Sequence, residues 1–338
     1  MHAPDRVTAR VPCEVADATA PIVVVGAHGQ SLFMHVAAVP GEGETVLGHG
    51  YVETVDGGKA TNQAVAAARL LAPVRLVSLV GDDDRGVRIL RHLDTTGVDR
   101  RWVRVAQAPT DVGFVMLPPS GIPAIASCGD LAAGIDEAFV TAAAGAIGGA
   151  SLVLCQLEAP EVCALTAFRL ARQIGARTVL NPAPAHHVSE ALLGLTDVLV
   201  PNEHEAAAMV GRPAPLAELA RTLAERAPHA DVVVTAGGDG AYLAARGQTV
   251  VHLPAPQVPA IDTTGAGDAF LGALAVRLRM GDAIEAAARY AVRAAAISVT
   301  RPGTMEAFAS PEEIDALPLG AGGSDLCRTV SPLGEPHL

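Results

Sequence analysis

Residues 262–268, with the sequence DTTGAGD, hold the strongest chemical signal in the chain. Small residues directly before an apolar helix let backbone N–H groups approach an anion, and the positive end of the helix dipole strengthens the attraction. Asp268 stands at the start of the apolar helix predicted over Ala269–Leu278, beside the place where the anion would lie. A carboxylate there can take the proton of an attacking hydroxyl while the N–H groups stabilise a transferred phosphoryl group. The other interpretation is an ordinary acid at a helix N-terminus.

A second glycine-rich segment, residues 56–63 (DGGKATNQ), opens a helix predicted over Ala60–Leu71. Paired glycines permit close approach of the backbone to a ligand, and Lys59 and Asn62, three residues apart, share one helical face. Together they offer a cation and an amide to the same ligand. Lys59 is the only lysine beside 23 arginines, and Asn62 is one of three asparagines, which favours a functional role. The alternative is a solvated lysine in a loop that starts a helix.

Two weaker patterns follow predicted strands. Asn202 and Glu205 stand at positions i and i+3 of a helix start, and such a pair of oxygen ligands suits a Mg²⁺ that keeps most of its waters. Glu205 equally suits the positive end of the helix dipole. Residues 235–240 (TAGGDG) predict a glycine-rich turn that fits either contact with a nucleotide or a tight hairpin.

Parallel strands and helices must position these motifs. Apolar runs of strand length alternate with helix-length segments, which predicts an α/β fold with a central, mostly parallel sheet covered by helices on both faces. The motifs follow the strand ends, where open parallel sheets bind their ligands. The predicted strands are Ile22–Val25, Arg75–Val80, Leu152–Cys155, Thr178–Leu180, Val198–Val200 and Asp231–Thr235. The further predicted helices are Gly86–Leu93, Glu161–Ile174, Glu203–Val210 and Leu216–Ala227.

A different pattern indicates a small β-strand lid. Residues 112–117 and 123–127 flank a Pro-Pro-Ser-Gly turn, which predicts a hairpin, and with residues 44–55 they predict an antiparallel flap over one edge of the sheet. The lid strands, from about 44–55 and 112–127, belong to one predicted domain over residues 21–317. Residues 1–20 and 318–338 are predicted to be flexible extensions.

The composition argues against several classes of protein. The 338 residues are half hydrophobic, which excludes a wholly disordered chain, and the net charge of −12 argues against a nucleic-acid partner. Five scattered cysteines fit a reducing compartment, and the charged first twenty residues do not resemble a signal peptide. The uncharged stretch Ala138–Cys155 contains three glycines, so it predicts a soluble helix and a strand rather than a membrane span. We therefore expect a cytoplasmic protein.

The motifs together resemble the ribokinase-like (PfkB) carbohydrate kinases. Residues 57–64 look like the first signature of that family, and residues 262–268 with Phe270, Gly272 and Ala273 look like its second. Four further segments are similar to the ribokinase branch in particular, at residues 156–158, 181–184, 201–205 and 299–303. The resemblance runs from about Pro21 to Leu317, with the motifs in the family's order and spacing.

The resemblance implies an ATP-dependent kinase that phosphorylates a hydroxyl of a small sugar or polyol. Asp268 would be the catalytic base, and the N–H groups of Gly265, Ala266 and Gly267 would form the anion hole. The implied sugar-binding residues, besides Asp268, are Gly29, Ser31, Gly57, Gly58, Lys59, Asn62 and Glu158. The implied nucleotide-binding residues are Asn202, Thr235, Gly237, Gly240, Gly265 and Gly267.

The family also implies metal ions. Mg²⁺ would be organised through water by Asn202 and Glu205. A K⁺ ion beside the anion hole would lie near Asp262, Thr264, Ser298 and Gly303. A lid with an exposed apolar face would favour a homodimer.

Several residues depart from the pattern of the ribokinases. After the first strand the family shows Gly-Ser-x-Asn-x-Asp, whose Asn and Asp grip sugar hydroxyls, whereas residues 26–31 here read GAHGQS. Without those partners ribose should bind poorly, and His28, Gln30 and Ser31 are the candidates to replace them. Ala60 and Leu71 stand where glycine is usual, and Val292 stands where ribokinases tend to carry a polar residue near adenine.

Three other functions stay open on the sequence alone. A nucleoside kinase of the same fold is the nearest to the main prediction. A sugar-binding protein without catalysis is suggested by the missing anchors near Ser31. A dinucleotide-dependent reductase would use Gly26 and Gly29 after the first strand, although the full glycine fingerprint is lacking.

Overall fold

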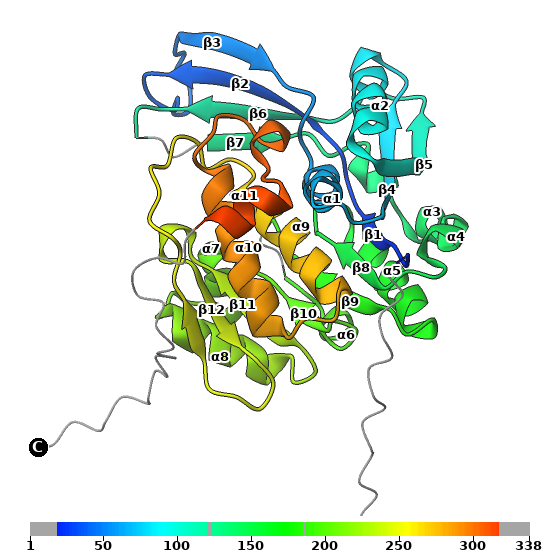
Figure 1. Ribbon diagram of the computed structural model, residues 1–338. Helices are drawn as coiled ribbons and strands as arrows, with labels where there is room; N and C mark the ends of the chain where they lie inside the picture. Colours follow the sequence, from blue (N-terminus) through cyan, green and yellow to red (C-terminus); the bar gives the residue numbers. More distant parts are fainter. Residues whose placement is uncertain (1–18, 121–123, 185–186, 318–338) are drawn as a thin grey trace, which may run out of the picture.

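A nine-stranded sheet forms the centre of the computed structural model, which describes residues 19–120, 124–184 and 187–317 (Figure 1). The strand order is β13-β12-β11-β10-β9-β8-β1-β4-β5, and all neighbours run parallel except β11–β12 and β12–β13. The strands are β1 (Ile22–Val25), β4 (Val74–Gly81), β5 (Val98–Ala106), β8 (Leu152–Cys155), β9 (Arg177–Leu180), β10 (Val198–Leu199), β11 (Asp231–Thr235), β12 (Ala241–Ala244) and β13 (Val251–Leu253).

Alternation along the central strand explains why both faces of the sheet are covered. All four residues of β1 are fully buried, yet successive side chains point to opposite faces. Ile22 and Val24 join one hydrophobic core, and Val23 and Val25 join the other. This confirms the predicted mostly parallel α/β fold.

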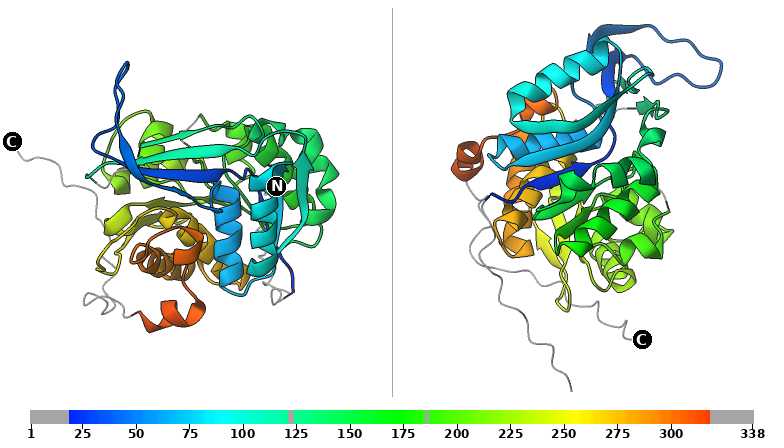
Figure 2. Two further views of the ribbon diagram at one scale, coloured as in Figure 1. Left: turned by 90° about the horizontal axis from the view of Figure 1, so that it is seen from above. Right: turned by 90° about the vertical axis from the view of Figure 1, so that its right-hand side faces the viewer.

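Helices form a layer on each face, as Figure 2 shows. The first layer comprises α1 (Lys59–Arg69), α2 (Asp84–Thr96), α9 (Ala266–Arg279), α10 (Ile284–Ser298) and α11 (Pro311–Ala316). The second comprises α3 (Glu137–Ala142), α4 (Ala144–Ile147), α5 (Glu161–Gln173), α6 (Glu190–Leu193), α7 (Glu203–Val210) and α8 (Leu216–Arg226). Short 3₁₀ helices occur at η1 (Ala132–Gly134), η2 (Gly237–Asp239) and η3 (Met305–Ala307).

Helices α1 and α9 pack closely because small residues face each other. A Cβ atom at Gly272 of α9 would lie 2.5 Å from Ala66 Cβ and 2.8 Å from the backbone nitrogen of Ala67 in α1. The alanine-rich composition of α1 therefore permits near contact of the two backbones. This contact holds the first turns of both helices, which carry Asn62 and Asp268, at the same rim of the sheet.

The lid is a second sheet of four strands in the order β3-β2-β6-β7, beside the first turns of α1 and α9 (Figure 1). Its strands are β2 (Gln30–Val36), β3 (Gly48–Glu53), β6 (Val112–Leu117) and β7 (Ala124–Ser127). The predicted hairpin of β6 and β7 is confirmed, while residues 121–123 lie outside the described residues.

The prediction of a wholly antiparallel lid is wrong, because β2 was not predicted and pairs parallel with β6. The chain leaves the central sheet after β1 and continues directly into the lid, so Gln30 lies opposite Val112, more than eighty residues away. Local patterning does not encode such a pairing. The lid exposes large apolar side chains, including Val52, Phe114 and Ile125. The homodimer nevertheless stays a prediction.

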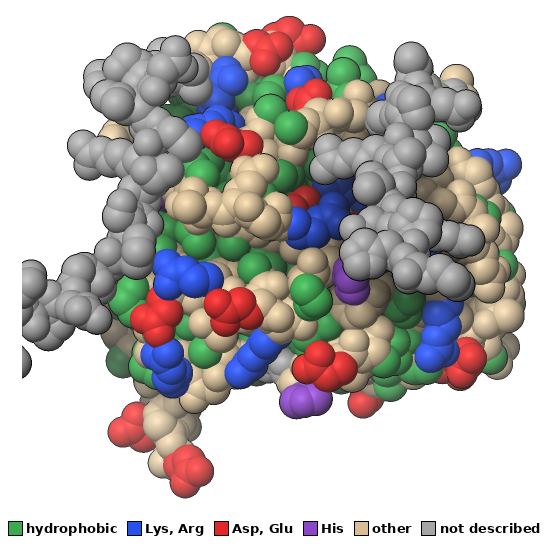
Figure 3. All heavy atoms as spheres, turned by 90° about the horizontal axis from the view of Figure 1, so that it is seen from below, with side chains coloured by type: hydrophobic (Ala, Val, Ile, Leu, Met, Phe, Trp, Pro, Cys, Tyr) green, Lys and Arg blue, Asp and Glu red, His purple; other side chains and the backbone are tan. Residues whose placement is uncertain are grey.

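The sequence also led to predictions about a membrane span and about the two ends of the chain. The described part of the chain contains no helix with the length and apolar character needed to span a membrane, and the stretch Ala138–Cys155 forms all but the first residue of α3, then α4 and β8. Most of the predicted extensions, residues 1–18 and 318–338, lies outside the described residues. Acidic and basic side chains are intermingled on the uncovered part of the face in Figure 3.

Candidate active site

The first turn of α9 brings Asp268 to the rim of the sheet. Gly265 caps the helix with a φ of 74°, a left-handed conformation, and a Cβ there would lie 2.3 Å from Thr304 Cγ2. Asp268 follows in the first turn and is 7% exposed. Of the three predicted anion-hole groups, the Ala266 N–H donates to the Thr263 carbonyl at 3.3 Å, a contact that a bound anion would have to replace.

Two amide side chains of α1 hold the carboxylate of Asp268. Asn62 Nδ2 donates to Oδ2 at 3.0 Å, and Gln63 Nε2 donates to Oδ1 at 2.9 Å. Burial raises the pKa of Asp268, while the charge of Lys59 and the two amide donors act in the opposite direction. Since both oxygens accept hydrogen bonds from N–H groups, the arrangement fits the ionised form, which can take up a proton.

Lys59 lies at the start of α1 among acidic side chains. Burial acts to lower the pKa of Lys59, but the carboxylates of Asp268, Glu158 and Glu205 hold it above its ordinary value. The Lys59 backbone N–H also donates to Glu158 Oε2 at 2.6 Å. Burial raises the pKa of Glu158 to about 7, against the lowering effect of Lys59. The site therefore holds a permanent cation and a carboxylate that titrates near neutrality.

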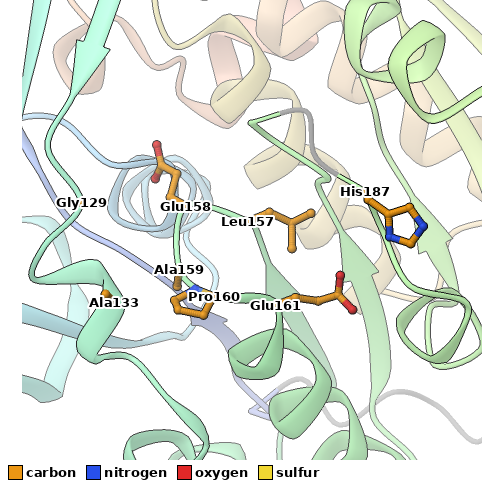
Figure 4. A pocket seen from close by; sticks show the side chains of 8 residues that line it. All are labelled: Gly129, Ala133, Leu157, Glu158, Ala159, Pro160, Glu161 and His187. Carbon is orange, nitrogen blue, oxygen red and sulfur yellow. The ribbon is translucent and has the colours of Figure 1, made fainter. Parts of the chain in front are cut away.

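Glu158 stands in the segment that follows β8, with its carboxylate directed towards α1 (Figure 4). Glu158 also lines a cavity of about 250 Å³, to which Glu161 and His187 contribute. His187 is exposed.

A cleft of about 830 Å³ lies between the lid and the loops that follow the strands. The predicted sugar-binding residues all line it, namely Gly29, Ser31, Gly57, Gly58, Lys59, Asn62, Glu158 and Asp268. Lid residues that the sequence did not assign to the site, Val112, Val115 and Ile125, form an apolar wall. These residues belong to the lid strands β6 and β7, whose position over the cleft depends on the pairing with β2.

A smaller cavity of about 110 Å³ adjoins the cleft. Lys59, Asp268 and Glu205 line both, so the three side chains stand at the junction. Other residues of the small cavity come from the predicted nucleotide site, namely Asn202, Thr235, Gly265 and Gly267. The dimensions suit a phosphoryl group that passes between two larger ligands.

A third cavity, of about 280 Å³, continues from Thr235 and Gly267 along the face of α9 and α10. The predicted nucleotide-binding residues Gly237 and Gly240 line it, as does Val292. Its apolar walls include Phe270 and Val299, which belong to the motifs named above, and residues that the sequence did not indicate, namely Ala255, Pro256, Val258 and Ala295. Residues 255–258 form a segment without a glycine or charge pattern, so no sequence signal pointed to them.

Comparison with known proteins identifies the family to which the chain belongs. The family model for pfkB family carbohydrate kinases matches residues 22–311. The chain belongs to the pfkB family. The ribokinase of Schizosaccharomyces pombe is 34% identical over 307 residues, which cover 87% of this chain and 96% of that protein. The ribokinase of Bacillus subtilis is 35% identical over 299 residues, which cover 88% and 98%.

The solved structure of Arabidopsis thaliana ribokinase with ribose and ATP superposes on this pfkB-family chain with a TM-score of 0.81 at 28% identity. The match covers 88% of this chain and 98% of that structure. The predicted family, fold and class of enzyme, an ATP-dependent carbohydrate kinase, are thereby confirmed. The dinucleotide-dependent reductase is not supported, because β1 of this pfkB-family chain continues into strand β2 and not into the helix that a dinucleotide site requires.

In this pfkB-family kinase the two residues predicted to organise Mg²⁺, Asn202 and Glu205, form hydrogen bonds with each other. Asn202 Oδ1 accepts from the Glu205 N–H at 2.8 Å, and Glu205 Oε2 accepts from the Asn202 N–H at 2.8 Å, a capping box at the start of α7. The described residues contain no group of three acidic, histidine or cysteine side chains that could hold a metal. The pair therefore fits an ion held through water and phosphate better than a directly coordinated one.

Three of the four predicted K⁺ residues, Asp262, Thr264 and Gly303, are joined by hydrogen bonds. Asp262 Oδ1 accepts from the Thr264 N–H at 2.9 Å, and Asp262 Oδ2 accepts from the Gly303 N–H at 3.0 Å. Ser298 is buried at the end of α10 and donates to the Ala295 carbonyl. Since both oxygens of Asp262 accept from backbone groups, this carboxylate primarily joins two loops of the pfkB fold.

The three residues that could replace the missing sugar-binding side chains, His28, Gln30 and Ser31, differ in their exposure and in their hydrogen bonds. Gln30 bonds to Glu53 and Arg88 of neighbouring elements, so its amide is already occupied. His28 is 3% exposed, and its Nδ1 contacts Thr61 Oγ1 at 3.1 Å. Burial lowers the pKa of His28 to about 4, so its ring is neutral at pH 7. Ser31 is half-buried and lines the cleft.

Proposed function

We propose that this protein transfers the γ-phosphoryl group of ATP to a hydroxyl of a small sugar or polyol, with Asp268 as the base. The observation that carries the proposal is the position of Asp268. It lies where the lid-covered cleft meets the small cavity at the start of α9, and both of its oxygens are held by amide donors. A base must stand within reach of the acceptor and beside the phosphoryl donor, and the position of Asp268 on both cavities supports this role.

Each residue of the proposed site has a separate role in phosphoryl transfer. The acceptor lies in the cleft with one hydroxyl at Asp268, which takes the proton as the oxygen attacks. Glu158 and Asn62 orient the other hydroxyls. Lys59 and the N–H groups at residues 265–267 stabilise the negative charge on the group in transfer. The lid excludes water, which would otherwise compete as the acceptor.

The proposed nucleotide site fits the group that it would hold. The 280 Å³ cavity is mostly apolar where a base would lie, and it opens at Thr235 and Gly267 towards the start of α9. When bound, ATP supplies the phosphoryl group and Mg²⁺ reduces its negative charge. Asn202 and Glu205 would hold the waters of Mg²⁺, and the loops joined by Asp262 would hold K⁺.

The test is a coupled assay of ADP release across sugars, polyols and nucleosides, with K⁺ or Na⁺ as the monovalent cation. We expect turnover with sugars or polyols and a higher rate in K⁺. Activity on nucleosides alone would favour the nucleoside kinase, and ligand binding without ADP release would favour the silent sugar-binding protein.

The Asp268→Asn variant tests the base. The substitution keeps the size of the side chain and removes its proton affinity, so we expect kcat to fall by about 10²- to 10⁴-fold while binding of ATP and acceptor persists. Isothermal titration of both ligands is the control for an intact site. Turnover within about threefold of wild type would refute the role of Asp268.

A further inference from the structure

Gln63 connects the carboxylate of Asp268 to the ends of two strands of the central sheet. Its Nε2 donates both to Asp268 Oδ1 at 2.9 Å and to Asn181 Oδ1 at 3.2 Å, and its Oε1 accepts from Gln156 Nε2. Asn181 directly follows β9, and Gln156 directly follows β8. Gln63 is fully buried and Gln156 is 1% exposed. Solvent therefore cannot supply these hydrogen bonds in their place.

One backbone group fixes the direction of every amide in this chain of contacts. Asn181 Nδ2 donates to the Val200 carbonyl at 3.0 Å, so Asn181 Oδ1 must be the atom that faces Gln63. Gln63 then presents its NH₂ group to Asn181 and to Asp268, and its oxygen to Gln156. The two protons of that NH₂ group are both used. The arrangement leaves Asp268 Oδ1 one role, that of an acceptor, which the ionised carboxylate fills best.

Gln63 differs in this respect from its neighbour Asn62. Asn62 also donates to Asp268, but it lines the cleft and is within reach of an acceptor. Gln63 lies beneath the cleft and does not line it. Any effect of Gln63 on the reaction must therefore act through the side chains that it contacts, namely Asp268, Gln156 and Asn181, of which Asp268 and Asn181 line the small cavity.

We propose that Gln63 is a positioning residue for the base: braced by Gln156 and Asn181, it holds the carboxylate of Asp268 ionised and in one orientation towards the acceptor hydroxyl. The inference rests on the proposed function of Asp268. It predicts that loss of the Gln63 NH₂ group slows turnover without weakening acceptor binding, because the carboxylate rotates or becomes protonated.

The surroundings of Asp268 make the pH dependence a suitable measurement. Removal of one N–H donor to an ionised carboxylate should raise the pKa of Asp268 further and move the acidic limb of kcat/KM to higher pH. Gln63→Met leaves unchanged the charged groups that face Asp268, which are Lys59 of α1, Asp56 of the preceding loop, Glu158 after β8 and Glu205 of α7. A shift of the acidic limb can then be attributed to the loss of the N–H donor of Gln63.

Two substitutions at Gln63 test the proposal. Gln63→Met keeps the length of the side chain and removes both polar ends, while Gln63→Glu keeps its shape and places an acceptor against Asp268 Oδ1. For both we expect kcat to fall about 10- to 100-fold, KM for the acceptor to change less than about threefold, and the acidic limb to move up by about one pH unit. Gln156→Met, one contact further away, should produce a smaller change in the same direction.

Thr178→Val is the matched structural control. Thr178 is fully buried, and its Oγ1 donates to the Leu195 carbonyl at 2.6 Å, near the opposite end of β9 from Asn181. This variant should lower the melting temperature but leave kcat and the acidic limb unchanged. The proposal is overturned if Gln63→Met keeps the wild-type kcat and limb, or if Thr178→Val reproduces its kinetic loss. An inactive Asp268→Asn beside a normal Gln63→Met would overturn only this inference, whereas an active Asp268→Asn would overturn the proposed function.

Discussion

The pKa of Glu158 leads to the sharpest kinetic prediction. Burial raises this pKa to about 7, and the carboxylate lies in the cleft where the acceptor would bind. One oxygen, Oε2, accepts from the Lys59 N–H, so an ionised Glu158 keeps Oε1 to accept a hydroxyl of the acceptor. We therefore expect the KM for the acceptor to fall as the pH rises from 6 to 8.

The magnitude follows from the titration of one group. With a pKa of about 7, Glu158 is ionised in about 9% of molecules at pH 6 and about 91% at pH 8. If only the ionised form grips the acceptor, the apparent dissociation constant is the intrinsic one divided by that fraction. The KM for the acceptor should then fall about tenfold over this range, with most of the change between pH 6 and 7.

The assay measures initial rates of ADP release at saturating ATP and Mg²⁺ while the acceptor concentration is varied at each pH. Glu158→Gln is the control, because its amide keeps an oxygen for the Lys59 N–H and cannot ionise. Its KM should be independent of pH, which separates Glu158 from Glu205 and Asp268, whose pKa values are also raised by burial. A wild-type KM that stays constant from pH 6 to 8, or a Glu158→Gln variant with the same slope, would refute the reasoning.

Two further predictions concern the packing around the site. Lys59→Arg should lower kcat by about 100-fold in the same assay, because a planar guanidinium is larger than the ammonium of a buried lysine that interacts with three carboxylates. Wild-type kinetics would show that only the charge matters. Gly272→Ala should lower the free energy of unfolding by about 1–3 kcal/mol in urea, because its Cβ would clash with Ala66 and separate α1 from α9. Gly148→Ala, where the nearest atom is 3.5 Å away, is the control and should be close to neutral.

Strong local signals predicted the parallel core of the fold. The bounds of β1, β8, β11 and α7 agree with the predicted segments, because an unbroken apolar run or a capped helix is specified by adjacent residues. The edge strand β5 and the antiparallel strands β12 and β13 were missed. Their side chains are buried or exposed according to which neighbour they pair with, and local sequence carries little of that information.

The sequence by itself determined which residues meet at the site, since glycine, lysine and carboxylate motifs after parallel strands must share one rim. It did not determine what each side chain does there. Asn202 and Glu205 cap their own helix, and Gln63 joins the base to β8 and β9. Those roles depend on which polar atoms remain unpaired once the layers have packed. Hydrogen bonds between residues more than a hundred positions apart exist only when the tertiary structure has brought them within 3 Å, and burial then raises the pKa of both Asp268 and Glu158.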